Sequence, residues 1–138
     1  MDAATLVAAL FGRTAGAMVE VVRHKNLVTS DRVVTEVRRR ITLGLNRPEL
    51  VPILDELLTL IVVVPVESLS PLLDDAERLL RNAVASRNGS TRDAHVLALA
   101  RDLGADIWST DRDFAGTGVA SWSTTNLMWA LQFPANAD

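Results

Sequence analysis

Residues 92–114 have the sequence RDAHVLALARDLGADIWSTDRDF, and this stretch decides the fold. Its first part predicts a helix over 93–103 that is apolar nearly all round and therefore buried on most sides. Gly104 stands where a left-handed residue ends such a helix. A strand is then expected over 105–110, ending in Asp111. A buried helix followed by a tight turn and a strand is typical of an α/β domain.

The rest of the chain continues this alternation of helices and strands. We expect helices over 3–23, 31–43, 49–60, 71–87 and 125–132, and strands over 27–29, 61–66 and 119–123. The alternation predicts a single α/β domain over residues 1–138 with a mainly parallel sheet. Ligands of such folds bind at the carboxyl ends of strands, so acids at strand ends and nearby helix starts are the candidates for a site.

Composition excludes several classes of protein. The 138 residues are 49% hydrophobic with a net charge of −3, which excludes a disordered chain and a basic nucleic-acid binder of the usual kind. Without cysteine there are no disulfides, zinc fingers or thiol catalysis. The strongest apolar run, Leu57–Pro65, is far shorter than the roughly 20 residues of a membrane-spanning helix. Because no basic region opens the chain, we expect a cytoplasmic protein with no membrane contact.

Four carboxylates follow strands or lie in or before the helices next to them. Asp111 follows a strand, Asp93 lies in the first turn of the buried helix, Glu36 lies in the helix after strand 27–29, and Asp2 precedes the first helix. Carboxylates packed together repel one another unless a cation joins them, and oxygen ligands suit Mg²⁺ or Mn²⁺. An ion held in this way activates water and clamps phosphoryl oxygens, which indicates metal-assisted hydrolysis of a phosphodiester.

Each acid also has a simpler interpretation. Asp93 alone is typical of a helix cap, Asp111 of a turn, and Glu36 of a solvated helix face. The spacing of the acids does not decide between the two interpretations.

The stretch 92–114 resembles the C-terminal half of PIN domains, the family of VapC-like toxin ribonucleases. That family has the pattern D-A-x-x-L-A-L-A, then a glycine, a strand and T-D-x-D-F. The matching segments here are Asp93–Ala100, Gly104, 105–110 and Thr110–Phe114. Val28–Val37 is similar to the family's strand and helix that carry a second acid, and Asp2–Leu10 to its opening D-x-N-x-L-L motif.

The resemblance implies a three-layer α/β/α fold with a mainly parallel central sheet. It also implies an endoribonuclease that depends on Mg²⁺ or Mn²⁺, the toxin of a toxin–antitoxin pair, with an RNA substrate, an antitoxin partner and a homodimeric state. The implied catalytic residues are Asp2, Glu36, Asp93 and Asp111, and the implied metal ligands are Asp2, Asp93 and Asp111. Asp113 and Thr110 are second-rank candidates.

The N-terminus departs from the family pattern. The family places its first aspartate at the end of a buried strand, whereas Asp2 follows only Met1, so the first strand is missing or truncated. Ala4 replaces the usual polar residue. Either the start lies upstream or the strand is lost, and loss would leave Asp2 on a frayed terminus. The alternative function is therefore a PIN-like binding module with weakened catalysis.

Arginines and a histidine stand close to the candidate acids in the sequence. Arg38, Arg39 and Arg112 could contact RNA phosphates, although a charge run on a helix is usually a solvated face. His95 shares a helix face with Asp102, seven residues on, and is predicted to be exposed and not a ligand.

Two other carboxylate–Mg²⁺ folds fit poorly. The only lysine, at position 25, is misplaced for a receiver domain, and residues 2–5 lack the D-x-D-x-T motif of haloacid-type phosphatases.

Overall fold

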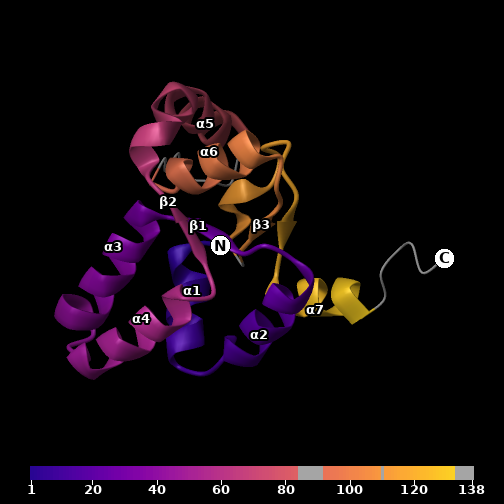
Figure 1. Cartoon of the computed structure of the whole chain (residues 1–138). Helices are drawn as coiled ribbons and strands as arrows, with labels where there is room; N and C mark the ends of the chain where they lie inside the picture. Colours follow the sequence, from indigo (N-terminus) through magenta and orange to yellow (C-terminus); the bar gives the residue numbers. More distant parts are fainter. Residues whose placement is uncertain (84–91, 110, 133–138) are drawn as a thin grey trace.

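The computed structural model describes residues 1–83, 92–109 and 111–132 of the chain (Figure 1). Helices and short strands alternate along this part of the molecule. The elements are α1 Ala3–Leu10, α2 Ala15–His24, β1 Val28–Ser30, α3 Asp31–Arg39, α4 Val51–Leu58, β2 Val62–Val64, α5 Ser70–Ala83, α6 Ala94–Leu103, β3 Ile107–Trp108, β4 Ser121–Trp122 and α7 Thr124–Gln132. In Figure 1, α5 and α6 lie above the strands and α1, α2 and α4 lie below them, which gives the predicted α/β/α layering.

The strands form two parallel pairs, as the sequence predicts. β1 pairs with β2, with Val28 opposite Val62, and β3 pairs with β4, with Ile107 opposite Ser121. Because partners in each pair run in the same direction, their carboxyl ends lie at the same edge. The carboxyl ends of β1 and β3 are the places where the candidate acids are expected from the sequence.

Met1 and Asp2 lie between the two pairs of strands. The amino group of Met1 donates to the carbonyl of Val28 at 3.3 Å, and the Met1 carbonyl accepts from Oγ1 of Thr29 at 2.8 Å. On the other side, the N–H of Asp2 donates to the carbonyl of Trp108 at 3.4 Å. The two residues therefore occupy the place between β1 and β3 without forming a strand, in agreement with the predicted missing or truncated first strand.

The prediction of one helix over 3–23 is wrong, because α1 and α2 are separate helices. Gly12 has φ +81°, in the left-handed region that favours glycine, and the chain turns there. The hydroxyl of Thr14 then donates to the carbonyl of Thr5 at 3.1 Å and ties the start of α2 to α1. Across the described residues no single helix could cross a membrane, and only the α1–α2 pair, bent by 118°, meets the length and composition required.

Most other elements match their predicted positions but are shorter. α3 ends at Arg39 and continues as a π-helical turn, Arg40–Gly44, and β3 and β4 have two residues each. A strand extends only where a neighbouring backbone can pair with it, and the β3–β4 register pairs two residues of each strand. The predicted helix end at 84–87 and the residues that were expected to cap the next helix, 90–91, lie outside the described residues.

The core is centred on α6, which contacts α5, β1 and β3. Its residues from Ala94 to Ala100 are all buried, so the prediction of a helix buried on most sides is confirmed. The prediction that His95 is exposed is wrong, because its exposed fraction is 1%. The sequence pairs His95 with Asp102 on one face. Asp102 is exposed in the last turn, beyond the core, whereas the first two turns are covered all round.

Candidate functional site

One cluster in the described residues has the donor atoms of a metal site. Glu36 from α3, with Asp93 and His95 from the start of α6, each offer one ligand atom, and these atoms lie within 4.8 Å of one another. Both carboxylates are partly buried and the imidazole is buried. Two carboxylates and an imidazole at this spacing fit a divalent cation, which would offset the repulsion between the acids.

Asp93 is placed by the helix that it begins. It is the N-cap residue of α6, and its carbonyl accepts from the N–H of Val96 at 3.0 Å. Its side chain makes no capping hydrogen bond to the helix. The simple capping interpretation of this acid is thus not what the structure shows, and the carboxylate lies instead beside Glu36 and His95.

Glu36 is placed by the amphipathic face of α3. Val33 and Val37 of the same helix are buried in the core, and Glu36 lies at the border of that face, where its side chain is 32% exposed. Arg40, one turn on, forms a loose ion pair with it at 4.0 Å. Such a long pair leaves the Glu36 carboxylate able to bind a cation.

His95 is held by Ser30, the N-cap residue of α3. Its Nδ1 is hydrogen bonded to Oγ of Ser30 at 2.8 Å, and the same Oγ accepts from the N–H of Val33 at 3.2 Å and caps α3. Burial lowers the pKa of His95 to about 4, and the nearby charge of Arg32 acts in the same direction. The imidazole is therefore neutral at pH 7, which is the form that binds metals.

Asp2 and Asp111 are linked to each other through Ser109. The Asp2 side chain, 4% exposed, accepts from the N–H of Thr5 at 3.0 Å and from the hydroxyl of Ser109. Oγ of Ser109 also accepts from the N–H of Asp111 at 2.9 Å. The expectation of a frayed position for Asp2 is wrong, because this residue is the buried N-cap of α1. Neither acid belongs to the Glu36–Asp93–His95 cluster.

The remaining sequence candidates lie around these groups. Thr110 and the side chain of Asp113 lie outside the described residues. Arg38 forms an ion pair with Asp55 at 2.6 Å. Arg39 and Arg112 are exposed.

Sequence reasoning missed four residues: Ser30, Arg32, His95 and Ser109. The available signal for His95 was its position two residues after Asp93 in the first turn of the same helix. That signal is weak, because the direction of a side chain near a helix start depends on what packs there. The two serines act through partners that are 65 and 107 residues away in the sequence.

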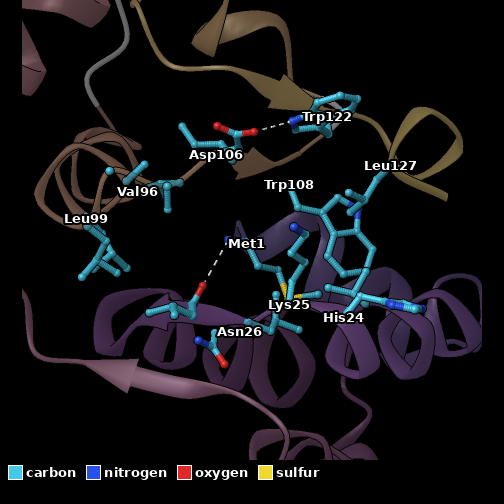
Figure 2. Close-up of a pocket in the computed structure, with 18 of the residues that line it drawn as sticks. Met1, His24, Lys25, Asn26, Val96, Leu99, Asp106, Trp108, Trp122 and Leu127 are labelled. Atoms are coloured by element: carbon cyan, nitrogen blue, oxygen red, sulfur yellow. Dashed lines mark hydrogen bonds between the residues drawn. The ribbon is translucent and has the colours of Figure 1, made fainter. Parts of the chain in front are cut away.

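A cavity runs along the strands, from the residues that precede β1 and β3 to Ser30 and Trp108 at the ends of these strands. This cavity, of about 790 Å³, is lined by the residues that precede β1 and β3 and by apolar side chains of α6 and α7 (Figure 2). At its inner end the Met1 amino group is bonded to Val28, and at its rim Asp106 accepts from the indole N–H of Trp122 at 2.9 Å. Burial lowers the pKa of the Met1 amino group to about 6. The predicted catalytic acids do not line this cavity.

The described strands thus form parallel pairs between helices, and Glu36, Asp93 and His95 form a group that could hold a metal ion. The family model described as PIN domain matches residues 1–132. The chain therefore belongs to the PIN-domain family, whose members are generally nucleases that bind divalent metals. Searches of curated proteins and of solved structures found no match to this chain.

Proposed function

We propose that the protein is a metal-dependent endoribonuclease that hydrolyses RNA phosphodiesters, and that it is the toxin of a toxin–antitoxin pair. The observation that carries the proposal is the approach of Glu36 and Asp93 to within 4.8 Å in a PIN domain. Carboxylates this close together repel one another, and a bound cation would offset that repulsion. The fit is to Mg²⁺ or Mn²⁺, whose chemistry is to acidify a bound water and offset phosphate charge.

The proposal gives each acid a separate task. Asp93 holds the cation from the start of α6. Glu36, on the neighbouring helix, orients the attacking water and accepts its proton. Asp2 and Ser109 position Asp111, whose exposed carboxylate completes the site from the end of β3. Asp93 begins α6 and Glu36 lies within α3, and side chains carried by helices favour this division of roles because their positions are set before substrate binds.

We propose that RNA phosphates are bound by exposed arginines beside the cluster. Arg39 follows Glu36 on α3, Arg112 follows Asp111, and the charge of Arg32 acts on His95. Arg38 is a weaker candidate because it is paired with Asp55. An acidic protein needs such local positive charge to approach a phosphodiester chain.

The partner protein is a further part of this proposal. Large apolar side chains are exposed around α4, a pattern that supports contact with an antitoxin or with a second copy of the chain. They are Leu43, Leu45, Ile53, Leu60, Val62 and Val63. Light scattering of the purified chain, alone and with a co-expressed antitoxin, would measure the composition of the assembly.

The decisive experiment is RNA cleavage by the purified chain in Mn²⁺ or Mg²⁺, repeated with EDTA. Asp93→Asn should abolish cleavage and Asp102→Asn, a change to an exposed acid at the far end of the same helix, should not. Cleavage that survives both EDTA and Asp93→Asn would exclude the proposed centre. Equal loss in both variants would indicate a general effect on the helix.

A second candidate function is a PIN-like binding module with weakened catalysis. The observation that favours it is Asp2, because hydrogen bonds from the Thr5 N–H and the Ser109 hydroxyl already engage its two carboxylate oxygens. This function predicts RNA binding without cleavage in Mn²⁺. Asp2→Asn would then lower the free energy of unfolding, and the RNA would stay uncleaved as it does with the parent protein.

A further inference from the structure

The cluster at the start of α6 contains a nitrogen donor that an acidic magnesium site does not need. We propose that His95 is a ligand of the same ion as Glu36 and Asp93, and that the centre therefore selects a first-row transition ion such as Mn²⁺ over Mg²⁺. This inference rests on the proposed function for its metal centre, but it does not require that the centre cleave RNA.

The first support for this inference is the position of His95. Its side chain is 1% exposed and comes from the second residue of α6, so that one of its donor atoms lies within 4.8 Å of the Glu36 and Asp93 oxygens. The carboxylates are partly buried and the imidazole is fully buried. A cation in the cluster would therefore meet oxygen donors toward solvent and nitrogen toward the core.

The second support is Ser30, because its hydrogen bond sets the orientation of the His95 ring. The hydrogen bond between its Oγ and Nδ1 of His95 is 2.8 Å long. When Nδ1 carries the ring proton and donates it to this oxygen, Nε2 has a free lone pair. Among the described residues, no hydrogen bond to Nε2 occupies that position. Metal-bound histidines are commonly held in this way, with the other ring nitrogen bonded to an oxygen.

A purely structural role accounts for less of the arrangement. A core histidine needs only the bond to Ser30, and that bond explains its burial. It does not explain why a buried imidazole lies against two carboxylates. A shared cation explains all three side chains together, because it neutralises the acids and uses the ring nitrogen.

The selectivity follows from the chemistry of the donors. Mg²⁺ prefers oxygen ligands and keeps several waters, whereas imidazole is a good ligand for transition ions. Replacing one water by His95 therefore gains more for Mn²⁺ than for Mg²⁺. Removing the imidazole should return the site to a carboxylate site with little preference between the two ions.

The test is pulsed electron paramagnetic resonance of Mn²⁺ bound to the whole chain, which detects nitrogen coupled to the ion. We expect nitrogen modulation in the parent protein, with frequencies that change when histidine is labelled with ¹⁵N. His95→Gln should remove the modulation, and His24→Gln, which changes the exposed histidine at the end of α2, should retain it. The labelled parent protein answers the question even if His95→Gln does not fold.

Competition by Mg²⁺ provides a second readout. The ratio of Mn²⁺ to Mg²⁺ affinity should fall at least about tenfold in His95→Gln, since even outer-sphere partners change metal affinity by this amount. Bound Mn²⁺ without nitrogen coupling, or an unchanged affinity ratio in His95→Gln, would overturn the inference.

RNA cleavage in the same samples separates the two proposals. Cleavage by a centre that lacks nitrogen coupling would overturn the role of His95 and retain the nuclease. Nitrogen coupling without cleavage would retain the centre and overturn the proposed function.

Discussion

The Glu36–Asp93–His95 cluster and the cavity differ in chemistry although the same helix lines both. The first turn of α6 places Asp93 and His95 beside Glu36, and its later turns place Leu99 and Leu103 in the wall of the 790 Å³ cavity. The acids and the imidazole thus gather beside Ser30 at the end of β1, whereas the cavity, which Ser30 also lines, has mostly apolar walls with Lys25 and Asp106 among them. The difference teaches that the candidate site is assembled where a side chain from the second turn of α3 meets two side chains from the start of α6, whereas the later turns of α6 line a cavity.

The largest effect is expected for the rate of RNA cleavage when Glu36 is changed. Glu36→Gln should lower the rate of RNA cleavage by at least about 100-fold, since the amide cannot accept a proton from water. Cleavage rates in Mn²⁺, with thermal unfolding to confirm folding, measure this. Glu56→Gln changes an exposed acid of α4 and should retain the parent rate. A Glu36→Gln protein with nearly full activity would remove this residue from the site.

The next effect is at the cavity. Leu99 is 5% exposed in the cavity wall, so Leu99→Ala should lower the free energy of unfolding by about 3 kcal/mol. Leu103→Ala, at a side chain that is 49% exposed, should cost much less. Urea unfolding measures both. If the cluster and the cavity act independently, Leu99→Ala retains the Mn²⁺ affinity of the parent, and a large loss of affinity would show that the cavity supports the site.

The pH dependence of stability should sharpen the contrast. The pKa of His95 falls from 6.5 in the unfolded chain to about 4 in the metal-free folded chain. As the pH drops below 6.5, the unfolded state takes up the proton first, so folding loses stability through this window down to pH 4. Between pH 7.5 and pH 5 the loss is about 2 kcal/mol.

Urea unfolding in EDTA at both pH values measures that loss, and the difference between the parent chain and His95→Gln isolates this group from the carboxylates. His24→Gln should keep the parent pH dependence. The same pH dependence in His95→Gln as in the parent would mean that another group takes up the proton.

The smallest effect concerns the link between α3 and α6. Ser30→Ala removes the cap of α3 and should cost about 1 kcal/mol of unfolding free energy. It should also weaken Mn²⁺ binding about tenfold, because the ring of His95 loses its fixed orientation. Ser30→Thr keeps the oxygen and should preserve most of both. Unchanged Mn²⁺ affinity in Ser30→Ala would show that packing alone orients the ring.

Local pattern was enough to predict much of this molecule. The stretch 92–114 identified the α6–β3 unit, because a helix buried on most sides, its terminal glycine and the following strand are short-range features. Asp93 could be selected because helix starts are visible in the sequence, and Glu36 because it borders the apolar stripe of the helix that follows strand 27–29. The alternation of elements predicted the layered α/β architecture for the same reason.

The tertiary structure decided which side chains meet. Ser30 contacts His95 across 65 residues and Asp2 contacts Ser109 across 107, and periodicity within one helix holds no information about such contacts. Packing buried His95 where helical spacing predicted exposure. By itself the sequence determined the elements and the acids, which depend on local conformational preferences. Only the tertiary structure brought Glu36 of α3 together with Asp93 and His95 at the start of α6, because contacts between residues so far apart in the sequence do not follow from local preferences.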